Sequence, residues 1–163
     1  MRKKLKLLIL AGIVALAISA PMQAAEKNHM TAQYYDIDGD IYYDSESIGQ
    51  AVVDYACQFV GNPYCWGGTS LTNGADCSGF TQSVFANFGI EIPRVAADQG
   101  REGTSIDLDD IQIGDLLFYG GNYISHVSIY IGDDQVVHAS NSRDGIIISS
   151  MEYYKPSSAR RYW

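Results

Sequence analysis

The sequence predicts an α+β fold, in which helices packed against a central antiparallel sheet form one domain. Two observations favour it. Apolar residues recur at helical spacing in two segments between residues 47 and 89, and strand-like segments follow from residue 111 onward. Helices first and hairpin-linked strands afterwards are typical of an α+β domain. The 163 residues suffice for one such domain, and no internal repeat marks a second one.

The first predicted helix begins at Ser47, which with Gln50 has the pattern of a capping box. It ends before Gly61 and Pro63. One apolar stripe runs along it and is formed by Ile48, Ala51, Val52, Tyr55, Ala56 and Phe59. We expect this helix to face the core as a scaffold.

The second predicted helix carries a cysteine in its first turn. Apolar residues recur along it at Phe80, Val84 and Phe88. Asp76 is placed as the N-cap, so Cys77 opens the helix, and Gly89 suits its end. The positive end of a helix favours a thiolate, which makes Cys77 a candidate nucleophile. A small buried apolar role is the alternative, because free cysteines are commonly buried.

Two histidines lie on a predicted hairpin. Strict alternation from His126 to Ile131 predicts a strand, and residues 135–139, which include His138, read as the returning strand. A two-residue turn at Asp133 and Asp134 would put the histidines on opposite faces of the sheet. A three-residue loop or a bulge would put them on one face, within side-chain reach. In that case Cys77, His126 and His138 could serve as nucleophile, base and orienting group.

Shorter patterns complete the domain. Residues 95–101 suggest a short helix, and strands are expected at residues 111–119, 145–151 and 159–163.

Neither a metal nor a cofactor is expected. The acidic run at residues 36–40 lacks the glycine and the twelfth-position acid of a calcium loop, where Ile41 and Ser47 stand. Zinc binding by cysteine and histidine lacks any paired CxxC spacing.

Residues 1–25 have the pattern of a secretory signal peptide. Met1 to Lys6 carries four positive charges, an apolar run of residues 7–18 follows, and small residues surround the expected cleavage region. The apolar run is short for a membrane span, although an uncleaved N-terminal anchor is the alternative. We therefore expect a secreted protein with no membrane attachment after cleavage. Residues 26–44 read as a polar leader and residues 45–163 as the functional domain.

The charge balance argues against nucleic acid as a partner. The full chain carries a net charge of −8, and loss of the four basic residues of the signal leaves seven basic residues against nineteen acidic ones, a net charge of −12. Phosphate backbones are bound by basic surfaces. A monomer is expected.

Six sequence blocks in order resemble the NlpC-type cell-wall cysteine peptidases. They are Pro63 to Gly68, Asp76 to Phe80, Ile92 to Arg94, Gly114 to Leu116, Ser125 to Gly132, and His138 to Ser140. The resemblance covers roughly residues 48 to 163 and implies a stripped-down papain-like fold. It also implies cleavage of peptidoglycan stem peptides at the γ-D-glutamyl bond to diaminopimelate or lysine.

The resemblance assigns roles to individual residues. It implies Cys77 as nucleophile, His126 as base and His138 as the residue that orients the base. Tyr64 would supply a hydroxyl beside the oxyanion. Asp76 and Ser78 match positions that grip the substrate, and Arg94 is a candidate to receive a substrate carboxylate, with a surface role as its alternative.

The sequence departs from the family pattern at two positions, and two functions other than peptidase are open. Cys65 stands where a non-thiol residue is usual, and Ile113 replaces the commoner proline before Gly114. An N-acetylmuramoyl-L-alanine amidase of the Cys/His amidohydrolase type would use the same groups. A non-catalytic wall-binding module would keep the fold without a reactive thiol.

Three cysteines leave one thiol unpaired if a disulfide forms. Cys57 and Cys65 could pair across the turn that ends the first helix, or both could be reduced packing residues.

Overall fold

The structure, a computed structural model, describes residues 33–35, 41–43, 45–121 and 123–163. The expected signal peptide and the acidic run at residues 36–40 lie outside the described residues. Within the expected leader, β1 (Gln33–Tyr35) pairs antiparallel with β2 (Ile41–Tyr43).

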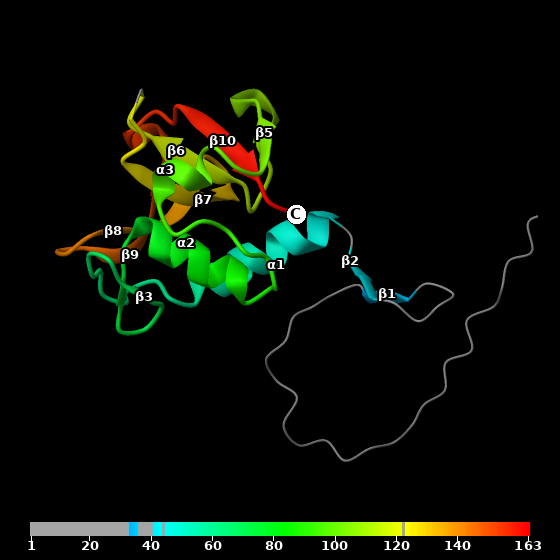
Figure 1. Cartoon of the computed structure of the whole chain (residues 1–163), viewed down its shortest axis with the longest axis horizontal. Coiled ribbons are helices and arrows are strands. Elements are labelled where there is room, and N and C mark those ends of the chain that lie inside the picture. The colour runs from blue at the N-terminus through cyan, green and yellow to red at the C-terminus, as the bar shows by residue number, and fades with distance from the viewer. Residues whose placement is uncertain (1–32, 36–40, 44, 122) are drawn as a thin grey trace, which may run out of the picture.

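The fold is α+β, as predicted. Its centre is a six-stranded antiparallel sheet in the order β5-β10-β6-β7-β8-β9, with helices packed on one face (Figure 1). The strands of this sheet are β5 (Thr104–Ile106), β6 (Leu116–Tyr119), β7 (His126–Gly132), β8 (Gln135–Asn141), β9 (Gly145–Ser150) and β10 (Ser158–Arg161). The remaining elements are α1 (Ser45–Cys57), β3 (Thr69–Ser70), β4 (Gly74–Ala75), α2 (Cys77–Ala86), α3 (Ala96–Gln99), η1 (Leu108–Asp110) and η2 (Met151–Tyr153).

The strand order has one crossover. Strands β6 to β9 follow one another as neighbours, as expected of hairpin-linked strands. The last strand, β10, returns to lie between β5 and β6 (Figure 1). The strand expected at residues 111–119 is shorter and begins at Leu116, because residues 111–115 are irregular and contain a turn at Ile113 and Gly114.

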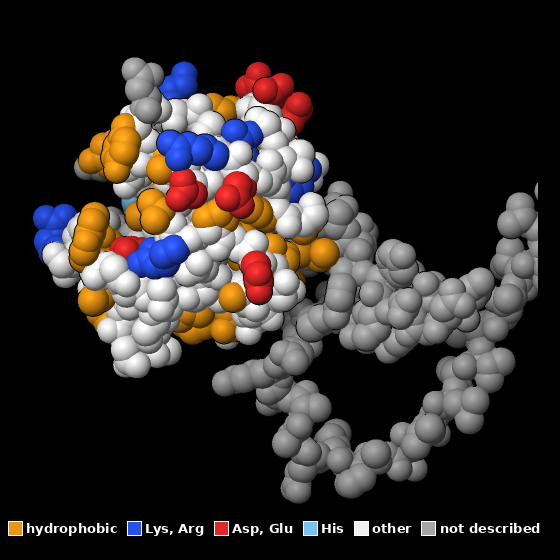
Figure 2. All heavy atoms as spheres, in the orientation of Figure 1, with side chains coloured by type: hydrophobic (Ala, Val, Ile, Leu, Met, Phe, Trp, Pro, Cys, Tyr) orange, Lys and Arg blue, Asp and Glu red, His pale blue; other side chains and the backbone are white. Residues whose placement is uncertain are grey.

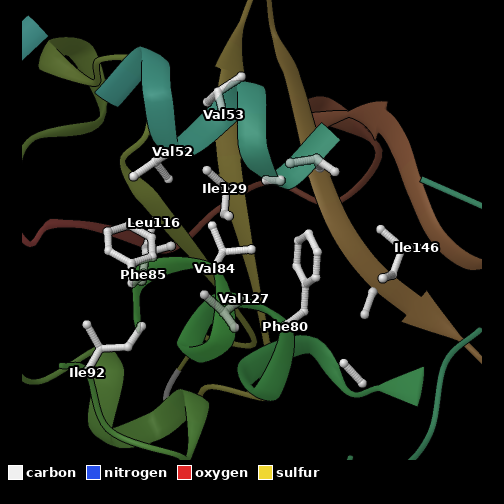
Figure 3. Packing of buried hydrophobic residues seen from close by; sticks show 14 of the residues in the cluster. Val52, Val53, Phe80, Val84, Phe85, Ile92, Leu116, Val127, Ile129 and Ile146 are labelled. Carbon is white, nitrogen blue, oxygen red and sulfur yellow. The ribbon is translucent and has the colours of Figure 1, made fainter. Parts of the chain in front are cut away.

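The main core lies between the helices and one face of the sheet. Val52 of α1 and Phe80, Val84 and Phe85 of α2 pack against side chains of the sheet, including Val127 (Figure 3). All of these are fully buried. Each such side chain contributes about 1.5–3 kcal/mol to the free energy of unfolding. This core holds the N-terminal end of α2 against β7 and β8.

Helix α1 differs at its start from the prediction. It begins at Ser45 rather than Ser47, and Gln50 donates from Nε2 to Asp54 Oδ1 at 2.8 Å. The predicted capping box is therefore wrong, since Gln50 is bonded along the helix surface. The apolar stripe is confirmed at Val52 and Ala56, which are fully buried.

The β7–β8 hairpin resolves the question of the histidine faces. Gly132 pairs with Gln135, so the turn has two residues, and Asp133 and Asp134 have φ angles of 50° and 56°. These angles are typical of a type I′ turn. The register then shifts between Tyr130 and Gly132, so that Ile129 lies opposite Val137.

The shift is a β-bulge, and it brings the two histidines onto one face of the sheet although the turn has two residues. Continuing the register from the pair Ile129 and Val137 places Ser128 opposite His138. His126, two residues from Ser128, therefore points to the same face of the sheet as His138. This is the face away from α1 and α2.

Candidate active site

Cys77 is the first residue of α2, as predicted, and Asp76 caps the helix. Asp76 Oδ1 accepts from the backbone N–H of Gly79 at 2.7 Å, and its carbonyl accepts from the N–H of Phe80 at 2.8 Å. The cap satisfies one of the orphan N–H groups of the first turn. The Cys77 backbone is thereby held where the helix opens.

The Cys77 sulfur is half-buried beside the start of β7. Burial is the largest influence on its pKa and raises it, and the charge of Asp76 acts in the same direction. The backbone N–H groups of Val127, Ser78 and Cys77 itself oppose that rise. The net direction is upward, so the thiol is neutral in the free protein at neutral pH.

The two histidines contact each other directly. His126 Nε2 lies 2.7 Å from His138 Nδ1, and the ring centroids are 4.9 Å apart with the planes at 77°. Burial lowers the pKa of both rings to about 4, and for His126 the neighbouring His138 lowers it further. Both imidazoles are therefore neutral at neutral pH. Figure 2 shows a small pale-blue histidine surface in a notch between apolar side chains.

The Cys77 sulfur lies beside the start of β7, the strand that carries His126. The Val127 N–H that faces the sulfur belongs to the residue directly after His126. Among the described residues, no hydrogen bond joins the Cys77 sulfur to the His126 ring. Catalytic hydrogen bonds are often long before substrate binds and shorten in the substrate complex.

A third group completes the chain of contacts behind the histidines. His138 Nε2 lies 3.0 Å from the hydroxyl oxygen of Ser149 on β9. No sequence pattern singles out this serine, which is one of several in the last strands. Its place follows only from the pairing of β8 with β9.

Tyr64 lies beside the same site. It forms an isolated parallel bridge with Ala75, two residues before Cys77. Burial raises the pKa of its hydroxyl, and negative charge on Cys77 and Asp76 raises it further. The phenol is therefore protonated at neutral pH and can donate a hydrogen bond.

Asp76, Ser78 and Arg94 form one polar cluster. Arg94 Nη1 donates to Asp76 Oδ1 at 2.9 Å and Nη2 donates to Oδ2 at 2.7 Å. Arg94 also donates to Ser78 Oγ at 3.0 Å, and the Gly67 N–H donates to Asp76 Oδ2 at 2.9 Å. The three sequence candidates for substrate binding are thus brought together at the start of α2.

The side chains of this cluster form most of their hydrogen bonds with one another and with neighbouring backbone groups. Burial alone would raise the pKa of Asp76, but the hydrogen bonds from Arg94, Gly79 and Gly67 outweigh it and lower the pKa. The carboxylate charge beside Cys77 is therefore largely compensated. Arg94 keeps a side chain that is 34% exposed, so the cluster presents a firmly held guanidinium at the surface.

Gln99 is a buried residue of this region that the sequence did not indicate. Its side chain is fully buried and its amide donates to the carbonyls of Ser78 at 3.1 Å and Pro93 at 2.7 Å. Gln99 also accepts from the Thr81 hydroxyl at 2.9 Å. It therefore ties the first turn of α2 to the segment that carries Arg94.

Other site classes receive no support from the described residues. The three cysteines, Cys57, Cys65 and Cys77, are all free thiols, so the Cys57–Cys65 disulfide considered above is absent. In the described part of the chain, no cluster of three or more histidine, cysteine or acidic side chains is arranged to hold a metal ion. There, too, no helix has the length and apolar character needed to cross a membrane.

Comparison with known proteins finds relatives that are named as peptidases. The chain is 41% identical over 117 residues to a probable endopeptidase of Corynebacterium glutamicum, covering 71% of this chain and 54% of that protein. It is 36% identical over 137 residues to the gamma-D-glutamyl-L-lysine dipeptidyl-peptidase of Bacillus cereus, covering 77% and 41%. The chain thus spans about half the length of these relatives.

A third relative has a length similar to this chain. It is the murein DD-endopeptidase and LD-carboxypeptidase of Escherichia coli, 34% identical over 172 aligned positions, covering 94% of this chain and 89% of that protein. The crystal structure of the NlpC/P60 domain of the peptidoglycan hydrolase SagA matches with a TM-score of 0.65 at 35% identity, covering 69% of this chain and 97% of that one. Residues 61–162 match the model of the NlpC/P60 family. The chain therefore belongs to the NlpC/P60 family.

Proposed function

We propose that this chain is a secreted peptidoglycan endopeptidase that cleaves the γ-D-glutamyl bond to diaminopimelate or L-lysine in stem peptides. Cys77 is the nucleophile, His126 the general base and His138 its orienting partner. The observation that carries the proposal is the 2.7 Å contact between His126 and His138 at the end of β7 where the backbone meets the Cys77 sulfur. The Bacillus cereus relative, named for the γ-D-glutamyl-L-lysine bond, supports this choice of bond.

The neutral resting state determines how the reaction begins. Because the Cys77 pKa is raised and the His126 pKa is lowered to about 4, the thiol proton must move as the sulfur attacks the carbonyl carbon. His126 Nε2 is occupied by His138, which leaves Nδ1 to take that proton. The helix position of Cys77 suggested a thiolate, and the burial of the thiol and of His126 favours general-base attack instead.

The later steps use groups already in place. The Cys77 N–H and the Tyr64 hydroxyl stabilise the oxyanion of the tetrahedral intermediate. His126 then gives its proton to the leaving amine, and the carbon–nitrogen bond breaks to leave a thioester on Cys77. His126 next takes a proton from water as that water attacks the thioester. The thiol is regenerated and the glutamyl carboxylate is released.

The cluster of Asp76, Ser78 and Arg94 is proposed to hold the stem peptide beside the thiol. Both terminal nitrogens of Arg94 are bonded within the protein, so its position is set before substrate arrives. Because the Arg94 guanidinium is already held in position, it needs little reorganisation to bind a substrate carboxylate. The side chain of Trp66, which precedes the Gly67 that donates to Asp76, is 86% accessible and offers an apolar contact.

Residues 1–25 are proposed to direct export, after which residues 45–163 act as a monomer on the wall. No nucleic acid, metal or cofactor takes part in the proposed reaction.

Cleavage of D,D-cross-links is the second candidate. It is favoured by the Escherichia coli relative, whose name includes murein DD-endopeptidase and which this chain matches over 94% of its own length. The same thiol and histidines would act, and the bond would be chosen by the surface around Arg94.

Mass spectrometry of purified peptidoglycan after incubation with the protein lacking residues 1–25 tests both candidates. Cleavage at the γ-D-glutamyl bond leaves fragments ending in L-alanyl-D-glutamate. D,D cleavage converts cross-linked dimers to monomers, and amidase activity would release intact stem peptides from the sugar. Cys77→Ala should abolish product, and Cys65→Ala, at an exposed thiol, should leave it unchanged. Product formation by Cys77→Ala at the wild-type rate would refute the proposed chemistry.

A further inference from the structure

We propose that Ser149 is a positioning residue whose hydroxyl oxygen accepts the Nε2–H of His138 and thereby holds both histidines in the tautomers that general-base catalysis requires. The inference rests on the proposed function of the same site. It extends the Cys77, His126 and His138 arrangement by one group, contributed by a different strand.

The backbone places Ser149 behind His138. Strands β8 and β9 pair so that His138 lies opposite Ile147 and Val136 lies opposite Ser149. Ser149 and His138 are therefore diagonal neighbours on one face, at a distance that side chains can span. The observed separation of Ser149 Oγ from His138 Nε2 is 3.0 Å.

The direction of the hydrogen bonds follows from the chemistry at Cys77. His126 can take the thiol proton only if its Nδ1 is bare, so its own hydrogen must be on Nε2. That N–H points at His138 Nδ1, 2.7 Å away, which must then be bare as well. The hydrogen of His138 is consequently on Nε2 and requires an acceptor at Ser149.

Ser149 becomes more important when His126 gains a proton. The imidazolium donates more strongly to His138, which in turn donates more strongly to Ser149, because linked hydrogen bonds polarise one another. His138 and Ser149 are both partly buried and lie 3.0 Å apart, so water would replace the hydroxyl without its fixed geometry. Without the hydroxyl, the His138 N–H loses its fixed acceptor, or the histidines adopt the reversed tautomers with a hydrogen facing the sulfur.

Kinetics of three variants test the role. Ser149→Ala should lower kcat about tenfold with little change in KM, since the partly buried His138 N–H loses its acceptor in the step that charges His126. Ser149→Thr keeps the hydroxyl and should restore most of the rate. Ser105→Ala removes an exposed hydroxyl at the opposite edge of the sheet and should leave the rate unchanged.

The pH profile and the tautomers supply readouts that a loss of packing would not move. In Ser149→Ala the acid limb of kcat/KM should shift to lower pH, because the imidazolium is stabilised less. Long-range proton–nitrogen spectra of the nitrogen-15-labelled protein should show the Nε2–H tautomer for both His126 and His138. In Ser149→Ala the His138 signals should become those of a mixture.

The outcomes separate this inference from the proposed function. If the wild type cleaves peptidoglycan but Ser149→Ala matches it in kcat and tautomers, the role of Ser149 is refuted and the peptidase proposal stands. If no wall product forms, the peptidase proposal fails, and the spectra still report whether Ser149 fixes the tautomer. A wild-type Nδ1–H tautomer at His138 would overturn the inference in either case.

Discussion

Replacing Asp76 with alanine should lower the free energy of unfolding by about 2–3 kcal/mol, whereas replacing it with asparagine should lower it by about 1 kcal/mol. The alanine variant loses the N-cap bond to Gly79, made at 2.7 Å, as well as the ion pair with Arg94. The asparagine variant keeps an oxygen that can cap the helix, but it loses the charge and the Oδ2 acceptor of Arg94 Nη2 and the Gly67 N–H. Since Asp76 and Arg94 side chains are 12% and 34% exposed, the ion pair is partly screened and contributes about 1 kcal/mol.

Urea unfolding followed by tryptophan fluorescence measures the difference. Trp163 stacks on Phe85 at 6.2 Å between ring centroids, so its emission reports on the core. A loss of 2–3 kcal/mol should move the midpoint of Asp76→Ala by roughly 1–2 M urea. Equal losses in the alanine and asparagine variants would refute the reasoning, because the cap would then contribute nothing separate from the charge.

The effect of pH has a definite sign. The pKa of Asp76 is lowered in the folded state, so its carboxylate stabilises the fold above the unfolded pKa of about 3.9. That stability is lost as the pH falls through the folded pKa. The gap between the wild type and Asp76→Asn should therefore be full at neutral pH and narrow below about pH 4. A gap that widens on acidification would contradict the assignment.

Three further predictions concern single residues. The ultraviolet absorbance of the thiolate, taken as the difference between wild type and Cys77→Ala, should be negligible at neutral pH and appear only in alkaline solution, since burial raises the Cys77 pKa. A difference absorbance that persists in mild acid would contradict a neutral thiol. Asp115→Ala should cost about 3–5 kcal/mol by thermal or urea unfolding, because Asp115 is fully buried and its two oxygens each accept from Arg161 at 2.8 Å; a loss below about 1 kcal/mol would show that the pair is dispensable. Gly79→Ala should destabilise the fold by about 1–3 kcal/mol and slow wall hydrolysis, since its new Cβ would approach the Gly68 carbonyl oxygen. An unchanged free energy of unfolding would show that the loop containing Gly68 moves to accommodate the new methyl group.

The sequence predicted those features that depend on local periodicity. The apolar stripe around Val52 and the cap at Asp76 arise from residues three or four apart, so the helices could be read directly. The hairpin that carries His126 and His138 was also evident from alternation. Whether the two rings shared a face depended on the bulge between Tyr130 and Gly132, which alternation alone does not reveal.

Features that depend on distant pairing could not be predicted. Strand β5, Thr104–Ile106, is short and largely exposed, so it carries no apolar pattern. Ser149 reaches His138 only through the register of β8 with β9. The neutral state of Cys77 reflects burial contributed by the whole fold, whereas the sequence shows only the helix end and Asp76, whose influences oppose each other.

The position of β10 affects when the domain can form during synthesis. Residues Ser158–Arg161 fill the gap between two strands made much earlier, β5 and β6. A nascent chain that has not yet released them from the ribosome has two incomplete strand edges and cannot close its sheet. Pairing over such separations is slow. The sheet should therefore stay open until residues 158–161 have left the ribosome.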